Sequence, residues 1–177
     1  MSKLIAFAGL PGTGKSTLAM ALCKTLNAAL LNKDDIRAAL FSPEEIDYSS
    51  RQNDFCMNVL YQLAVFHAAR NSDRHIIIDG RTFSKSEQLL PLRECATRCQ
   101  RELILVECIC SDEMARSRLR QDYERSIHPA ADRNEALYDH VKATSQPITM
   151  PSITVNTEDE SLERNIQLIL QTIRLAK

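Results

Sequence analysis

The sequence predicts a doubly wound α/β fold, a parallel sheet of about five strands with helices on both faces. Apolar, strand-like runs recur along the chain, and segments with helical periodicity separate them. This alternation is typical of a parallel sheet, because each parallel connection needs a crossover that is usually a helix. The middle runs are continuous in Ile, Leu and Val, which indicates strands that are buried on both faces.

Bulk composition favours a single domain over residues 1–177, with 44% hydrophobic residues and a net charge of −1. This charge supplies no global attraction to nucleic acid or membranes. No apolar run approaches the roughly 20 residues that cross a bilayer, and no segment before the first strand can serve as a signal peptide. The six cysteines lack zinc-like spacing. We therefore expect a cytoplasmic protein with reduced thiols and no membrane contact, and the sequence predicts no particular oligomeric state.

The strand-like runs set the order of the elements. They are KLIAFAG at residues 3–9, a weaker AALLN at 28–32, RHIIIDG at 74–80, ELILVECIC at 102–110 and SITVNT at 152–157. Helix-start signals of the capping-box type begin at Ser42, Ser84 and Thr157. Two apolar stripes at helical spacing predict helices that face the core, on Phe55, Val59, Leu63 and Phe66 and on Leu162, Ile166, Ile169 and Ile173.

A glycine-rich loop follows the first strand. GLPGTGKS at residues 9–16 matches the Walker A pattern and lies between an apolar strand and a helix that begins near Lys15. Glycines let successive N–H groups point at phosphate oxygens, and the helix adds the positive end of its dipole. The loop therefore predicts a P-loop NTPase fold that binds ATP through Gly9, Leu10, Pro11, Gly12, Thr13, Gly14, Lys15, Ser16 and Thr17.

Three polar residues of this loop have separate expected roles. Lys15 is expected to reach the β- and γ-phosphates and to act in catalysis, Ser16 to hold Mg²⁺, and Thr17 to reach the next phosphate. The spacing differs from G-x-G-x-x-G, so a dinucleotide site is not supported. The donor side of the site is thus predicted to be ATP with Mg²⁺.

The stretch LNKDDIRAALF follows the second strand, at the sheet edge where a doubly wound fold places its nucleotide. Asp34 and Arg37 are three residues apart and share a helix face, whereas Asp35 points away. An aspartate here can orient an acceptor hydroxyl and take its proton, and an arginine can hold the acceptor or the phosphoryl group. The alternative is that Asp34 or Asp35 simply caps the helix.

The two motifs together carry a resemblance to a known group. GLPGTGKSTLA followed by NKDDIR resembles the P-loop small kinases, a group of AAA-family ATP-binding proteins that includes polynucleotide 5′-hydroxyl kinases, zeta toxins and chloramphenicol phosphotransferase. The resemblance covers nearly the whole chain as architecture, and these first two motifs are its specific part. It implies that Asp34 is the general base, hence a catalytic residue, and that Arg37 contacts the acceptor.

The third strand ends in Asp79, within HIIIDGRTFSKSEQ. An acid at this position is expected to assist Mg²⁺ or to touch the acceptor, and the alternative is an ordinary Asp-Gly turn. Arg81 follows in the same loop and either binds an anionic acceptor or pairs with surface acids. We therefore assign Asp79 and Arg81 to substrate binding, with Asp79 also assigned to the metal.

An arginine-rich segment follows the fourth strand. In the resembling kinases this segment, here near residues 111–133, is a lid whose arginines close over ATP and neutralise the transferred phosphoryl. Those relatives show R-L-x-x-R, but here RLRQD places Asp122 at the second arginine. We therefore expect Arg118 to bind ATP and to act in catalysis, with Arg120 or Arg125 replacing the missing group. A solvated charged helix face is the alternative.

These features predict a kinase that transfers the γ-phosphoryl group of ATP to a hydroxyl of a small molecule. The first alternative is a polynucleotide 5′-hydroxyl kinase, whose partner is a 5′-hydroxyl nucleic acid and which needs a basic channel beside Asp34. The second is a P-loop ATPase or nucleotide switch without an acceptor pocket. The sequence identifies neither the acceptor nor a preference for ATP over GTP.

Overall fold

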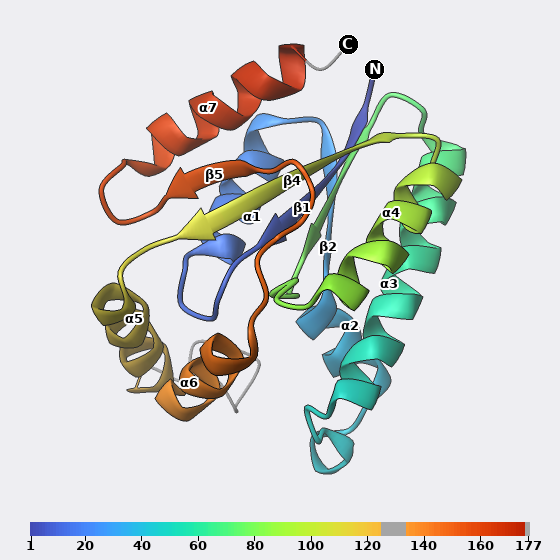
Figure 1. The fold of residues 1–177 in the computed structure, drawn as a ribbon. Coiled ribbons are helices and arrows are strands. Elements are labelled where there is room, and N and C mark those ends of the chain that lie inside the picture. Colours follow the sequence, from blue (N-terminus) through green and yellow to red (C-terminus); the bar gives the residue numbers. More distant parts are fainter. Residues whose placement is uncertain (125–133, 176–177) are drawn as a thin grey trace.

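Five parallel strands form one sheet in the order β2-β3-β1-β4-β5 in the computed structural model, which describes residues 1–124 and 134–175 (Figure 1). The predicted doubly wound α/β fold is confirmed, because every neighbouring pair of strands is parallel. The bounds are β1 Lys3–Ala8, β2 Ala28–Asn32, β3 His75–Asp79, β4 Glu102–Ile109 and β5 Ile153–Asn156. Each lies within the apolar run that predicted it.

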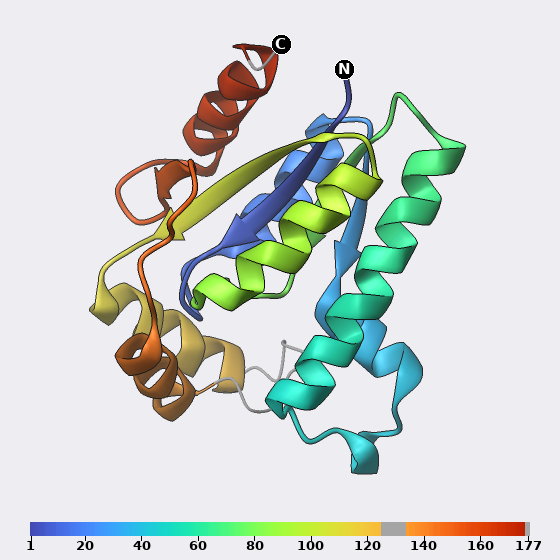
Figure 2. The same cartoon turned by 45° about the vertical axis from the view of Figure 1, so that its right-hand side comes forward.

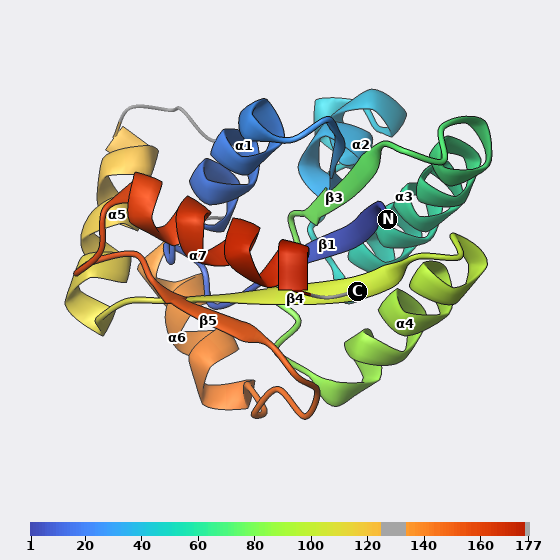
Figure 3. The same cartoon turned by 90° about the horizontal axis from the view of Figure 1, so that it is seen from above.

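Helices cover both faces of the sheet (Figure 3). In the described part of the chain the α-helices are α1 Lys15–Thr25, α2 Lys33–Leu40, α3 Ser50–Arg70, α4 Leu89–Arg98, α5 Asp112–Glu124, α6 Glu135–Thr144 and α7 Leu162–Leu175. Side chains of α1 and α7 pack on one face, and those of α3 and α4 pack on the other. The pair α5–α6 and the connection from α2 to α3 lie at the same end of the sheet (Figure 2).

The central strand β1 shows why both faces are apolar. Its side chains alternate between the faces: Leu4 and Ala6 join the core beneath α3 and α4, whereas Ile5 and Phe7 join the core beneath α1 and α7. All four are fully buried. A strand that must be apolar on both sides cannot show polar alternation, which explains its continuous hydrophobic sequence.

The capping boxes do not mark the α-helix starts as predicted. The box at Ser42 forms, but it closes only a 3₁₀ turn at Pro43–Glu45, and the residue that caps α3 is Ser49. The other two helices begin later than predicted, α4 at Leu89 and α7 at Leu162. Their predicted caps are engaged elsewhere, since the Ser84 hydroxyl meets that of Thr82 and the Thr157 hydroxyl donates to the Thr13 carbonyl.

One of the two apolar stripes is oriented differently from the prediction. Phe55 and Phe66 on α3 are 52% and 56% exposed, because the helix turns Met57, Leu60 and neighbouring residues toward the sheet instead. The Phe55 ring meets Phe41 edge-on with centroids 6.0 Å apart. The stripe on α7 is largely confirmed: Ile166, Ile169 and Ile173 are buried, and Leu162 lies at the exposed end.

Within residues 1–124 and 134–175, no helix has both the length and the apolar character that a membrane crossing requires.

Candidate active site

The loop from Gly9 to Thr17 joins β1 to α1 at the carboxyl end of the sheet (Figure 1). Gly14 is the N-cap of α1 and adopts the left-handed conformation with φ of +80°, and no side chain caps this helix. Gly12 is also left-handed, and a Cβ there would collide with the Ala115 carbonyl of α5. The glycines therefore serve both the turn and a close contact between the loop and α5.

Lys15 folds back over this loop. Its Nζ donates to the Leu10 carbonyl at 2.7 Å, and the Thr13 hydroxyl donates to the same oxygen at 2.8 Å. The Lys15 side chain is thus held inside the concave loop, and the residue is only 9% exposed. Ser16 is half-buried beside it and Thr17 is exposed. A cation held in a loop of backbone N–H groups at a helix amino terminus is suited to phosphate.

Asp79 ends β3 and is the buried carboxylate of the site. It is 1% exposed; its Oδ2 accepts from Asn32 Nδ2 at 2.8 Å, and its Oδ1 has no hydrogen-bond partner among the described residues. The loop that follows β3 touches the phosphate loop, because the Gly9 N–H donates to the Thr82 carbonyl at 3.0 Å. An orphaned buried oxygen next to a phosphate loop fits a hard cation such as Mg²⁺.

The donor set fits Mg²⁺ better than a transition metal. In the described residues no group of three or more His, Cys, Asp or Glu side chains could hold a metal by itself. Mg²⁺ is ordinarily bound by one or two protein oxygens together with substrate phosphates and water. Ser16 and Asp79 supply a donor set of that kind.

Asn32 is a site residue that the sequence analysis missed. Its Oδ1 accepts from the backbone N–H groups of Asp34 and Asp35 at 2.7 and 3.3 Å, and its Nδ2 holds Asp79. Asn32 therefore caps α2, and the alternative that Asp34 or Asp35 caps it is wrong. An asparagine just before a helical pattern is a recognisable N-cap signal.

Asp34 lies on the same face of α2 as Arg37, as predicted, whereas Asp35 is exposed. Arg37 Nη1 donates to Asp34 Oδ1, and Arg37 is itself only 2% exposed. Lys33 Nζ lies 3.8 Å from the same Asp34 oxygen. The carboxylate thus lies at the carboxyl end of β2 between two cations, and its exposed fraction is 13%.

Arg81 meets an acid from α3. Its Nη2 donates to Asp54 Oδ1 at 2.6 Å, and the arginine side chain is 16% exposed while that of Asp54 is 57% exposed. An ion pair this open contributes little to stability. An anionic acceptor group would have to compete with Asp54 for this guanidinium, and the role of Arg81 in substrate binding stays a prediction.

Arg118 is the arginine of α5 that reaches the phosphate loop. Its Nη1 donates to the Gly12 carbonyl at 3.3 Å and to the Thr157 hydroxyl at 3.0 Å, and its Nη2 donates to the Thr157 carbonyl at 2.8 Å. The Thr157 hydroxyl in turn donates to the Thr13 carbonyl at 3.0 Å. Arg118 therefore ties α5, the phosphate loop and the β5–α7 connection together.

The other arginines of this segment face α6. Arg116 pairs with Asp139 and Glu135, and its guanidinium lies 5.1 Å from the centroid of the Tyr138 ring. Arg120 Nη1 contacts Glu135 at 2.8 Å. These pairs join α5 to α6. In this structure Arg120 contacts Glu135 rather than the phosphate loop, and its replacement of the missing arginine stays a prediction. The part of the predicted lid at residues 125–133, which includes Arg125, lies outside the described residues.

Two cysteines near the phosphate loop are protonated thiols, which are poor nucleophiles. Cys108 is buried below Gly9, and burial raises the pKa of its thiol to about 12. Burial also raises the pKa of the Cys110 thiol, although the nearby Arg118 opposes the shift. Neither group is a thiolate at neutral pH, so the cysteines give the site no covalent chemistry.

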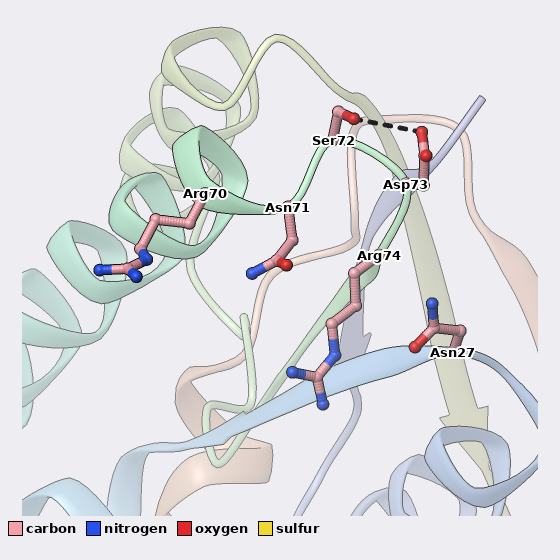
Figure 4. A pocket seen from close by; sticks show the side chains of 6 residues that line it. All are labelled: Asn27, Arg70, Asn71, Ser72, Asp73 and Arg74. Atoms are coloured by element: carbon pink, nitrogen blue, oxygen red, sulfur yellow. Dashed lines mark hydrogen bonds between the residues drawn. The ribbon is translucent and has the colours of Figure 1, made fainter.

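A polar depression of about 470 Å³ lies elsewhere, lined by Asn27, Arg70, Asn71, Ser72, Asp73 and Arg74 (Figure 4). Asn27 and Arg74 directly precede β2 and β3, so it lies at the amino ends of the strands, opposite Asp34 and Asp79. The guanidinium groups of Arg70 and Arg74 point in different directions (Figure 4). It contains none of the predicted site residues.

The fold and this site define a P-loop kinase-like protein. The family model for the AAA domain matches residues 4–148, and the chain therefore belongs to this family. No curated protein matches the chain in a sequence search.

Solved structures resemble the whole chain. A candidate kinase from Chloroflexus aurantiacus has a TM-score of 0.74 and 23% identity, with 96% of this chain and 97% of that chain covered. The Mycobacterium tuberculosis APS kinase CysC, in complex with AMPPNP and APS, has a TM-score of 0.71 and 17% identity, with 98% of both chains covered. A gluconokinase from Sinorhizobium meliloti has a TM-score of 0.66 and 18% identity, with 98% and 93% covered. At these identities the likeness concerns the fold.

Proposed function

We propose that this protein is an ATP-dependent kinase that transfers the γ-phosphoryl group to a hydroxyl of a small molecule. The observation that carries the proposal is Asp34, a carboxylate at the carboxyl end of β2 that is held by Arg37 and not used as a helix cap. We further propose that residues 1–177 act as one domain in the cytoplasm, with residues 111–133 as the lid. The α2–α3 connection and the α5–α6 pair at one end of the sheet support this arrangement (Figure 2).

The phosphate loop would bind the donor. Lys15 would leave the Leu10 carbonyl and contact the β- and γ-phosphates, while the backbone N–H groups of residues 9–17 contact the phosphate oxygens. Ser16 and Asp79 would hold Mg²⁺, which supplies charge neutralisation at the phosphates. Arg118 already contacts the Gly12 carbonyl and would turn from it toward the phosphoryl group.

Asp34 would act on the acceptor. The acceptor hydroxyl donates its hydrogen bond to the carboxylate, its oxygen forms the new bond to the γ-phosphorus, and the bond to the bridging oxygen of ADP breaks. The hydroxyl proton passes to Asp34 as the new bond forms. An aspartate in this role needs a fixed orientation, and the contact with Arg37 supplies one.

The charges around Asp34 favour a small acceptor over a nucleic acid. Lys33 bonds to Asn53, Arg37 bonds to Asp34, and Arg81 bonds to Asp54. A nucleic acid needs a row of cations that can contact successive phosphates, whereas these three are committed to partners within the protein. The gluconokinase and the APS kinase among the similar structures agree with a small-molecule acceptor.

The test is a transfer assay with γ-labelled ATP, Mg²⁺ and pooled acceptors, namely metabolites, nucleosides and 5′-hydroxyl oligonucleotides. The proposal expects labelled product from a small hydroxyl compound, and much less product with Asp34→Asn. Label in the oligonucleotide pool would instead identify a polynucleotide kinase.

Hydrolysis of ATP without any labelled acceptor would identify an ATPase or switch, above all if Asp34→Asn hydrolysed ATP as fast as the wild type. Either of these outcomes overturns the proposal. Binding of ATP by itself is measured in parallel, so that a protein that does not bind nucleotide is not mistaken for one without an acceptor.

A further inference from the structure

Arg37 is buried in the protein rather than presented to an acceptor. Its Nη1 donates to Asp34 Oδ1 and its Nη2 donates to Asn53 Oδ1, while its Nε is buried and finds no hydrogen-bond partner in residues 1–124 and 134–175. The guanidinium also lies 5.0 Å from the centroid of the Tyr48 ring. With 2% of the residue exposed, Arg37 has almost no surface with which to bind a ligand.

Asn53 is the residue that joins this group to α3. Its Oδ1 accepts from Lys33 Nζ at 2.8 Å as well as from Arg37, and its Nδ2 donates to the Tyr48 carbonyl at 2.8 Å. Only a carboxamide can accept from two cations through one atom and donate to a carbonyl through the other. The two cations that flank Asp34 are therefore held by one side chain.

The connection from α2 to α3 fixes Asn53 from the other side. Tyr48 has a left-handed φ of +51°, which is uncommon for a tyrosine. Gln52 holds this segment independently: its Nε2 donates to the Glu45 carbonyl at 2.9 Å, and its Oε1 accepts from the N–H groups of Asp47 and Tyr48, both at 3.3 Å. Among the described residues the Gln52 side chain bonds to this connection and not to Arg37 or Asp34, which makes it a matched control for Asn53.

We propose that Arg37 and Asn53 are positioning residues that orient the Asp34 carboxylate, and that Arg37 does not contact the acceptor. This inference rests on the proposed function, because it concerns the residues that hold the Asp34 carboxylate, which is proposed to act on the acceptor hydroxyl. It also changes the role that the sequence resemblance implied for Arg37. The carboxylate is held by Arg37, Arg37 by Asn53, and Asn53 by the Tyr48 backbone.

The proposal predicts a loss of turnover without a loss of substrate binding. Misplacing a reacting group by about 1 Å can cost roughly 100-fold in rate. Asn53→Ala leaves the ion pair between Arg37 and Asp34 but removes the side chain that holds Arg37. Arg37→Lys keeps the charge but loses the rigid fork of two Nη donors with which Arg37 contacts Asp34 and Asn53. Both changes would act on kcat, since neither side chain contacts ATP or the acceptor.

The kinetic test uses water as the probe nucleophile and measures steady-state hydrolysis of Mg-ATP. We expect Asn53→Ala and Arg37→Lys to lower kcat by about 10- to 100-fold while KM for ATP stays within about twofold. Gln52→Ala, which loosens the same connection, should keep kcat within about threefold of the wild type. If Gln52→Ala lowers kcat as much as Asn53→Ala, the loss comes from the loosened α2–α3 connection and not from the contacts of Arg37 with Asp34 and Asn53. The proposal is then overturned.

Failure of the positioning role differs from failure of the proposed function. If Asp34→Asn lowers kcat but Asn53→Ala and Arg37→Lys do not, Asp34 acts without this support and only the inference falls. If the acceptor KM of Arg37→Lys rises at unchanged kcat in the transfer assay, Arg37 contacts the acceptor and the inference again falls. If the wild type binds ATP but transfers no label to a small hydroxyl compound, whether or not it hydrolyses ATP, the proposed function falls.

A double-mutant cycle on unfolding does not depend on turnover. The unfolding equilibrium constant in urea is measured for Asp34→Asn, Asn53→Ala and the double variant. If Arg37 bridges the two side chains, the effects do not multiply, and the double variant departs from the product of the single variants by about fivefold or more. If the effects on the unfolding equilibrium constant multiply within error, Arg37 does not couple Asp34 to Asn53. The proposal is then overturned even when no hydrolysis can be measured.

Discussion

Asp79→Asn is expected to stabilise the protein and to weaken its response to Mg²⁺. The carboxylate is 1% exposed, and one of its two oxygens has no hydrogen-bond partner in the described part of the chain. An unsatisfied buried polar atom costs about 1–3 kcal/mol, and more when the group is charged. Asparagine has almost the same shape and can still accept from Asn32 through its Oδ1, while its Nδ2 takes the place of the oxygen without a partner. The expected gain therefore comes from the loss of the buried charge. We therefore expect the free energy of unfolding to rise by about 1–3 kcal/mol.

The assay is urea unfolding of the protein without nucleotide, followed by thermal unfolding with ATP in the presence and absence of Mg²⁺. For a chain of this size, about 1 kcal/mol corresponds to a shift of roughly 2–4 °C in Tm. In the wild type, Mg²⁺ should increase the stabilisation by ATP, and at about 100 times the Kd a ligand contributes about 2.7 kcal/mol. In Asp79→Asn the part that depends on Mg²⁺ should be lost.

Asp73→Asn is the matched control, because Asp73 is exposed just before the same strand. It should change the free energy of unfolding by no more than about 0.5 kcal/mol and leave the Mg²⁺ response intact. An Asp79→Asn variant that is less stable than the wild type would refute the view that this carboxylate is uncompensated. An unchanged Mg²⁺ response would refute its assignment to the metal.

Arg118→Met should lower phosphoryl transfer by about 100-fold, whereas Arg116→Met, which removes a contact to α6, should change it by no more than about threefold. Equal losses in rapid-quench assays would show that the α5–α6 pair as a whole, and not Arg118, supports transfer. Burial lowers the pKa of His75 from its ordinary value of 6.5, and its Nδ1 accepts from the Lys3 N–H. The unfolded chain therefore binds the proton more readily, so stability is present above pH 6.5 and is lost as the pH falls through the lowered pKa. In urea unfolding from pH 7 to pH 5, His75→Asn should reduce the change of the unfolding free energy with pH, and substitution of the exposed His140 by Asn should not. The opposite pattern would refute the assignment of this change to His75.

The position of the phosphate loop between a strand and a helix could be predicted from the sequence because it is local. Residues 9–17 are consecutive, and the strand before them and the helix after them impose one geometry. The shared helix face of Asp34 and Arg37 could be predicted for the same reason, since the two are three residues apart on α2, whereas their ion pair was not predicted.

The support of Asp34 could not be predicted from the sequence. Asn53 reaches Arg37 from another helix, and no periodic pattern in either segment indicates that contact. Asn32 lies close by in sequence, but its bond to Asp79 depends on the pairing of β2 with β3. Contacts of this kind follow from the tertiary fold rather than from local preference.

The start of α7 and the buried face of α3 could not be predicted from the local sequence either. Thr157 has the sequence of a capping residue, but its hydroxyl is used by the Thr13 carbonyl and by Arg118. Phe55 and Phe66 fit a core stripe at helical spacing, yet α3 turns a neighbouring face with Met57 and Leu60 toward the sheet and leaves both rings exposed. In both cases a tertiary contact overrode the preference that the local sequence indicated.

In the proposed function, Asp34 directs the transfer of a phosphoryl group to a hydroxyl acceptor. This role is tested most directly by the single-turnover rate of γ-phosphoryl transfer to the pooled hydroxyl compounds, with Asp34→Asn compared with Asp35→Asn. The exposed Asp35 is the adjacent residue on α2, so the pair differs in position and not in chemistry. We expect Asp34→Asn to lower this rate by about 100-fold or more while its nucleotide affinity stays within about twofold of the wild type. Asp35→Asn should transfer at the wild-type rate. Transfer by Asp34→Asn at the wild-type rate would contradict the proposed role of Asp34.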